Sequence, residues 1–208
     1  MSGDDPASPQ VLVLATFNPG KIRELTALLA APGRRLRSLA EFAGAAAPVE
    51  HGATLLENAR LKADAAVRYT GLPAIADDTA LEVEALGGAP GVRSARFAGE
   101  GAGDAANVAL LLEWLASVSL ERRRARFRTV CVGRFPDGRE WVGEGVLEGT
   151  IALAPRGAHG FGYDPVFEVP ALGRTLAELD EAAKNNLSHR ARAARALALR
   201  LPAPRQSR

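Results

Sequence analysis

The stretch VLVLATFNPGK, residues 11–21, passes directly from an apolar run into a helix start. Val11–Ala15 is short and continuously apolar, which is typical of a strand buried on both faces. Asn18 and Pro19 then have the pattern of a helix N-cap followed by proline at the first helical position. A buried strand that leads into a helix N-terminus presents backbone N–H groups and the positive end of the helix dipole. The stretch therefore predicts an α/β fold with an anion site at this turn.

Strand and helix patterns alternate along the rest of the chain, which favours an α/β fold with a mixed, twisted central sheet flanked by helices. No internal repeat or linker divides the pattern, so we expect a single domain over residues 11–201, a disordered tail over 1–10 and a second tail over 202–208. The predicted helices begin at Pro19, Thr54, Asn107, Thr175 and Ser188, and the further predicted strands are 35–39, 74–76, 81–85, 127–134, 140–147 and 166–169.

The composition of the 208-residue chain, with 47% hydrophobic and 24% charged residues, is that of an ordinary soluble protein. It has no long apolar run and no leader pattern, so we expect neither a membrane span nor a membrane partner. The single cysteine, Cys131, excludes an internal disulfide and fits a cytoplasmic location. A net charge of +2 is too small to indicate nucleic acid as a partner.

Only three of the 26 basic residues are lysines, and each lies among other polar groups. Lysine is a compact point charge that suits a single phosphate oxygen, whereas arginine is a planar fork. Lys21 follows the helix start described above, where Thr16 and Asn18 add side-chain donors and Gly20 permits close approach of the backbone. A simple helix cap explains the same residues, and both interpretations can hold together.

Two adjacent carboxylates, Asp77 and Asp78, end the predicted strand 74–76. Buried carboxylates are costly unless a cation compensates them, and ligands bind at this end of the strands in open α/β sheets. Mg²⁺ is typically held by one or two carboxylates plus substrate phosphates, and Asp78 with Glu57 would supply that number. The alternative is a turn-forming aspartate pair, with Glu57 completing a capping box on Thr54.

Two later segments could contact a nucleotide. Phe161, between two glycines, is free to stack on a flat ligand, and Asp164 could accept hydrogen bonds from a base or ribose; a core phenylalanine beside an Asp-Pro turn explains them equally well. Ser188 is a good N-cap, which places His189 and Arg190 in a first helical turn, where the helix dipole disfavours cations. An anionic or carbonyl-bearing ligand would remove that penalty.

Taken together, these segments resemble the inosine/xanthosine triphosphate pyrophosphatase family, which hydrolyses non-canonical purine nucleoside triphosphates. The resemblance extends from Val11 to about Leu201. Six stretches carry it: Thr16–Lys21, Glu57–Ala63, Ala76–Val92, Ser94–Gly99, Gly160–Phe167 and Ser188–Arg190.

The resemblance implies two lobes with a nucleotide-binding cleft between them, a Mg²⁺ cofactor and a homodimer. It makes Asp78 the catalytic base and, with Glu57, a metal ligand. It also implies a set of substrate-binding residues: Thr16, Phe17, Asn18, Pro19, Gly20, Lys21, Lys62, Thr79, Phe161, Gly162, Tyr163, Asp164, Lys184, His189 and Arg190.

The family most often has Ser-Gly after the aspartate pair, whereas this chain has Thr79 and Ala80. Threonine keeps the hydroxyl, but alanine would strain the backbone if its position required a positive φ.

The expected reaction is metal-assisted hydrolysis of dITP, ITP or XTP to the monophosphate and pyrophosphate. Hypoxanthine and xanthine present a 6-oxo acceptor where adenine presents an amino donor, so a site of donors would select them. Two alternatives stay open: a pyrophosphatase of related fold that acts on other modified nucleotides, and a non-catalytic binder of nucleotides or nucleic acid.

Overall fold

The computed structural model describes residues 10–203, and these form five α-helices and eight strands with short 3₁₀ turns. The strands are β1 (Gln10–Leu14), β2 (Arg34–Ser38), β3 (Ala74–Val83), β4 (Pro90–Gly91), β5 (Arg124–Arg134), β6 (Glu140–Ile151), β7 (Phe167–Val169) and β8 (Arg174–Thr175). The helices are α1 (Pro19–Leu29), α2 (Leu55–Thr70), α3 (Asp104–Trp114), α4 (Glu181–Leu187) and α5 (His189–Ala198).

The chain divides into two compact units, and β3, β5, β6 and α5 each contribute residues to both. Of the described residues, the first unit contains 10–78, Val130–Glu144 and 193–203, and the second contains Thr79–Thr129 and Gly145–Arg192. The single-domain assignment remains a prediction. The predicted tails lie outside the described residues except at their inner ends, where Gln10 is the first residue of β1.

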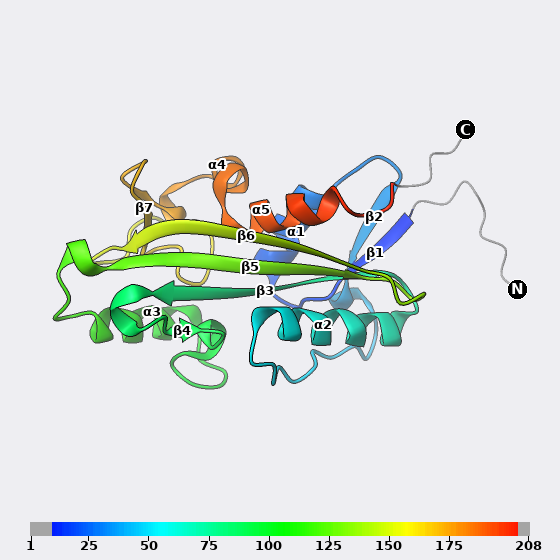
Figure 1. Cartoon of the computed structure of the whole chain (residues 1–208), viewed down its shortest axis with the longest axis horizontal. Coiled ribbons are helices and arrows are strands. Elements are labelled where there is room, and N and C mark those ends of the chain that lie inside the picture. Colours follow the sequence, from blue (N-terminus) through cyan, green and yellow to red (C-terminus); the bar gives the residue numbers. More distant parts are fainter. Residues whose placement is uncertain (1–9, 204–208) are drawn as a thin grey trace, which may run out of the picture. The chain divides into compact units, whose positions relative to one another are not determined.

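The first unit contains the parallel part of the sheet. β1 pairs in parallel with β2 on one side and with β3 on the other. Helix α2 covers one face of these strands, and α1 with the end of α5 covers the other (Figure 1). The core on the α1 side joins Leu25 and Leu29 of α1 to Ile75 of β3 and to Leu197 of α5. Cys131 is fully buried in this core.

The second unit continues β3, β5 and β6 and adds antiparallel pairs: β4 with β3, β7 with β6, and β8 with β7. Together with the parallel pairs of the first unit, this is the mixed sheet that the sequence predicted. Its core packs α3 residues Val108 and Leu111 against Phe127 and Phe167. Within the described residues, every helix is too short or too polar to cross a membrane.

Local signals located most helix starts correctly. The Asn18 side chain caps α1 with Pro19 in the first turn, and Thr54 and Glu57 form a reciprocal capping box on α2. The capping box of Thr175 and Glu178 also forms, but it opens a 3₁₀ turn, because Asp180 provides the cap of α4.

The prediction that a strand stops at Asp77 was wrong, because β3 runs without interruption from Ala74 to Val83. Ala80 lies within this strand and is buried, and no non-glycine residue from 10 to 203 has a positive φ. The alanine that replaces the family's usual glycine therefore causes no left-handed backbone strain.

Candidate functional site

The turn from β1 into α1 has the geometry of an anion-binding helix N-terminus. Oδ1 of Asn18 accepts a hydrogen bond from the Lys21 backbone N–H at 3.0 Å, and the Asn18 N–H donates to Oγ1 of Thr16 at 3.2 Å. Phe17 between them is 39% exposed, and Gly20 is buried in the first turn. The loop is therefore held by its own side chains in a conformation that presents the N-terminus of an 11-residue helix.

The two adjacent aspartates of β3 interact with different helices. Successive side chains of a strand point to opposite faces of the sheet. Asp77 accordingly pairs with Lys21 of α1, Oδ2 to Nζ at 3.0 Å, whereas Asp78 pairs with Lys62 of α2, Oδ1 to Nζ at 2.7 Å. Both aspartates are buried, and the two lysines compensate their negative charges. The strand can therefore continue through both positions.

Asp78 belongs to a small polar group that we call the Asp78 cluster: Asp78, Lys62, Asn58 and Glu50. Nδ2 of Asn58 donates to Oδ2 of Asp78 at 3.4 Å, and Lys62 also binds Oε1 of Glu50 at 3.1 Å. The three residues of β3 and α2 are less than a tenth exposed. Lys62 therefore bridges the buried Asp78 carboxylate and the more accessible one of Glu50.

Carboxylates outnumber ammonium groups here, since Asp77, Asp78 and Glu50 face Lys21 and Lys62. Burial alone would lower the pKa of Lys62, but the three carboxylates outweigh it and raise that pKa above its ordinary value. Burial raises the pKa of Asp78, although Lys62 and Lys21 oppose the shift. A carboxyl group with a raised pKa is a stronger base than an ordinary aspartate, and an excess negative charge favours a bound cation.

Glu57 is engaged elsewhere. Its Oε2 accepts hydrogen bonds from the backbone N–H groups of Ala53 at 2.7 Å and Thr54 at 3.1 Å, as the capping-box alternative predicted. Among the interactions of the described residues, none joins Glu57 to Asp78. Glu50, which the sequence argument missed, is the carboxylate that shares Lys62 with Asp78. It lies in an irregular loop, where no periodicity or cap marks it.

The donor set of the Asp78 cluster fits a hard divalent cation. Asp78 and Glu50 supply carboxylate oxygens, the ligands that Mg²⁺ prefers, and two such groups suffice when substrate phosphates and water complete the coordination. No group of three or more His, Cys, Asp or Glu side chains in metal-binding proximity occurs over residues 10–203.

A second group of predicted residues meets in the second unit and forms what we call the Phe161 cluster: Phe161, Asp164, Lys184 and Arg190. The Lys184 ammonium binds the Asp164 carboxylate, and both side chains are nearly inaccessible. Lys184 Nζ lies 4.9 Å from the centre of the Phe161 ring and the Arg190 guanidinium carbon lies 5.2 Å from it. Both distances are in the range of cation–π attraction, so the ring and the two cations hold one another in place.

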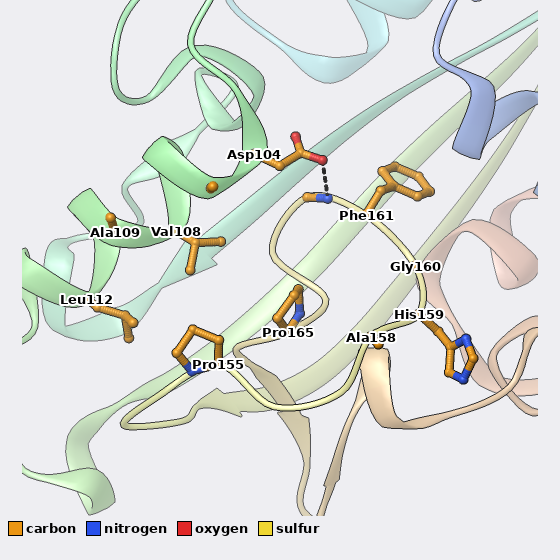
Figure 2. A pocket seen from close by; sticks show the side chains of 12 residues that line it. Asp104, Val108, Ala109, Leu112, Pro155, Ala158, His159, Gly160, Phe161 and Pro165 are labelled. Carbon is orange, nitrogen blue, oxygen red and sulfur yellow. Dashed lines mark hydrogen bonds between the residues drawn. The ribbon is translucent and has the colours of Figure 1, made fainter.

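The loop that carries Phe161 is fixed from both sides. Oδ2 of Asp164 accepts from the Phe161 N–H at 2.8 Å, and the Asp104 carboxylate at the start of α3 accepts from the Gly162 N–H at 2.7 Å. Gly160 and Gly162 both have positive φ, which glycine adopts without strain. Figure 2 shows that the Phe161 ring points away from the α3 side chains.

A cavity of about 450 Å³ lies on the α3 side of this loop (Figure 2). Apolar side chains, among them Val108, Leu112 and Pro155, line most of it.

Tyr163 has a structural role, because its buried hydroxyl donates to the backbone oxygen of Ser94 at 2.9 Å. Burial raises the pKa of Tyr163, so the phenol stays neutral.

His189 and Arg190 begin α5, as predicted, and both are buried. They join a series of hydrogen bonds that we call the hydroxyl chain: Arg190, Thr79, Thr129 and His189. Nη2 of Arg190 donates to Oγ1 of Thr79 at 3.2 Å; the two threonine oxygens are 2.7 Å apart, and Oγ1 of Thr129 is 2.6 Å from Nδ1 of His189. Nothing in the sequence marks Thr129 as a site residue, because threonine is an ordinary strand residue.

The sequence-predicted residues thus divide between the two units. The first unit holds Thr16, Phe17, Asn18, Pro19, Gly20, Lys21, Glu57, Lys62 and Asp78, and the second unit holds Thr79, Phe161, Gly162, Tyr163, Asp164, Lys184, His189 and Arg190. Asp78 and Thr79, consecutive in β3, mark the boundary. The first group provides cations and carboxylates suited to a polyphosphate, and the second provides an aromatic platform and hydrogen-bond donors suited to a base.

Comparison with known proteins finds the same relationship by three routes. A family model described as the Ham1 family matches residues 12–199. A dITP/XTP pyrophosphatase of Thermus thermophilus is 53% identical over 186 residues, 89% of each chain. One of Geobacillus kaustophilus is 50% identical over 182 residues, 88% of this chain and 89% of that protein. The structure of a HAM1 protein from Coxiella burnetii superposes with a TM-score of 0.81 at 41% identity, covering 91% of this chain and 97% of that one.

Proposed function

Because the chain belongs to the Ham1 family, we propose that it hydrolyses non-canonical purine nucleoside triphosphates, dITP, ITP and XTP, to the monophosphate and pyrophosphate. The enzyme thereby removes these nucleotides from the pool. The Asp78 cluster is the main structural support for this proposal. In it, Lys62 holds the buried Asp78 carboxylate, whose pKa is raised, beside the carboxylate of Glu50.

In the proposed mechanism Asp78 is the general base. A carboxylate has about four lone-pair sites, and the contacts with Lys62 and Asn58 occupy two of them, so Asp78 can still accept a proton from water. The water oxygen bonds to the α-phosphorus, its proton passes to Asp78, and the bond from the α-phosphorus to the bridging oxygen breaks. Pyrophosphate leaves with that oxygen.

Positive groups of the first unit would bind the triphosphate. The N-terminus of α1, with Thr16, Asn18 and Lys21, offers backbone and side-chain donors, and Lys62 adds a second ammonium. Such fixed donors stabilise charge that develops in the transition state. We propose Mg²⁺ as the cofactor, held by Asp78 with Glu50 in preference to Glu57; when bound, it would neutralise phosphate charge.

The base would be recognised by the second unit. Phe161, flanked by Lys184 and Arg190, would stack on the purine, and donors from His189 and Arg190 would pair with a 6-oxo group. Adenine presents an amino donor at this position, so its binding would leave buried donors unsatisfied.

Assaying dITP, XTP, ATP and GTP separately with Mg²⁺ tests the function, with the products resolved by ion-exchange chromatography. We expect monophosphate and pyrophosphate from dITP and XTP at rates far above that from ATP. Equal rates on all four substrates would contradict the selectivity. In H₂¹⁸O the label should enter the monophosphate, because attack occurs at the α-phosphorus; label in the pyrophosphate would contradict the mechanism.

We also propose that the enzyme is cytoplasmic, which its single cysteine fits, and that it is a homodimer, as the resemblance implies. Sedimentation equilibrium of the full chain tests the dimer through its mass. The alternative of a nucleic-acid binder predicts salt-dependent binding that survives Asp78→Asn, whereas the proposed hydrolysis does not survive it.

A further inference from the structure

Thr129 is a buried residue of β5 that the proposed mechanism does not use. The residue is 1% exposed, and its hydroxyl lies between Oγ1 of Thr79 at 2.7 Å and Nδ1 of His189 at 2.6 Å. The His189 ring also stacks on Phe127, with the ring centres 4.4 Å apart and an interplanar angle of 26°. The imidazole thus stacks on an aromatic ring and has the Thr129 hydroxyl within hydrogen-bond distance of Nδ1.

The donors favour one direction for the hydroxyl chain. The guanidinium of Arg190 can only donate, so Thr79 accepts from it at one end. A neutral imidazole nitrogen is a better acceptor than a hydroxyl oxygen, so the favoured order is Arg190 to Thr79, Thr79 to Thr129, and Thr129 to Nδ1 of His189. Hydrogen bonds in series polarise one another, and a permanent cation at the start strengthens this order. The remaining ring proton of a neutral His189 then resides on Nε2.

We propose that Thr129 is a positioning residue for base selection, whose hydroxyl fixes His189 as the Nε2–H tautomer and so keeps it a hydrogen-bond donor. This inference rests on the proposed function for its consequence, since a donor at His189 pairs with a 6-oxo purine and repels the 6-amino group of adenine. The opposite tautomer would make Nε2 an acceptor and would favour the wrong base.

The tautomer can be measured without any substrate. Long-range ¹H–¹⁵N correlation spectra distinguish protonated from unprotonated ring nitrogens, and the chain has only three histidines, of which His51 and His159 are exposed. At a pH where imidazole is neutral, we expect His189 to show a protonated Nε2 in the wild type and in Thr129→Ser. Thr129→Val keeps the shape but removes the hydroxyl, and it should give a tautomer mixture at His189 alone, with the other two histidines as internal controls.

Selectivity is the second readout. The ratio of kcat/KM for dITP to that for dATP should fall about tenfold or more in Thr129→Val and return towards wild type in Thr129→Ser. A thermal melt of each variant confirms that it is folded. A wild-type His189 protonated at Nδ1, or a Thr129→Val protein with unchanged tautomer and unchanged selectivity, would overturn the proposal. If the wild type hydrolysed neither nucleotide, the proposed function would fail, while the spectra would still decide the role of Thr129.

Discussion

The ammonium nitrogen of Lys62 lies 2.7 Å from Oδ1 of Asp78, and both residues are buried. The pair joins the middle of α2 to the middle of β3. Breaking a buried pair leaves an uncompensated charge, so each partner constrains the other. Lys62 therefore has two effects. It holds the Asp78 carboxylate in one orientation. It also opposes the effect of burial on the pKa of Asp78, so it favours the ionised carboxylate, which can accept a proton.

Asp78→Asn should lower kcat by about 10²- to 10⁴-fold, because it removes the general base. Asp77→Asn is the matched control, one residue earlier in β3 on the opposite face, where it contacts Lys21. We expect it mainly to raise KM, since Lys21 loses its anchor. Steady-state kinetics with dITP separate the two effects. Equal losses of kcat in both variants would exclude a special role for Asp78.

The pH dependence of kcat should follow Asp78. Burial raises the pKa of this group, so kcat should fall on acidification at a pH above the usual aspartate value of about 3.9. In the pH profile of the residual activity of Asp78→Asn, the fall at acidic pH should be absent.

The contribution of Asp78 to folding stability depends on pH in the opposite direction to that of an ordinary ion-paired aspartate. Folding raises the pKa, so this carboxyl favours folding most at low pH and loses that contribution as the pH rises through its folded pKa.

Glu50→Gln and Glu57→Gln should separate the two candidate metal ligands. Glu50→Gln should raise the Mg²⁺ concentration needed for half-maximal activity, because Glu50 shares Lys62 with Asp78. Glutamine can still complete a capping box, so Glu57→Gln should leave both the Mg²⁺ dependence and the helix nearly unchanged. Removal of the metal with EDTA should abolish activity, and Mg²⁺ should restore it. If Glu57→Gln raised the Mg²⁺ concentration needed for half-maximal activity and Glu50→Gln did not, Glu57 would be the metal ligand.

Phe161→Ala should weaken substrate binding more than it slows chemistry. Stacking of a base on an aromatic side chain is worth about 1–3 kcal/mol, so KM for dITP should rise roughly 5- to 150-fold. Phe161→Tyr keeps the ring and is the control, with KM expected to stay near the wild-type value. An unchanged KM in Phe161→Ala would mean that the ring does not contact the base.

The sequence predicted what is local and missed what depends on long-range packing. The caps at Asn18 and Thr54 were found because a cap depends on residues three positions apart. The uninterrupted course of β3 was missed because it depends on Lys21, 56 residues before Asp77, and on Lys62, 16 residues before Asp78. Glu50 was missed for the same reason, since only the folded chain brings its loop to Lys62.

Gly160 and Gly162 provide a matched pair of alanine substitutions on either side of Phe161. Both have positive φ, so each should lose about 1–2 kcal/mol of stability from backbone strain. A Cβ at Gly162 would meet nothing within 4 Å, whereas one at Gly160 would come closer than 3.0 Å to the carboxyl group of Asp164. Gly160→Ala must therefore also displace the carboxylate that binds Lys184 and the Phe161 N–H. Chemical denaturation should show a larger loss of stability for Gly160→Ala than for Gly162→Ala, and Gly160→Ala should also have a higher KM for dITP. Equal losses of stability with equal KM values would show that the Asp164 contact does not hold the loop.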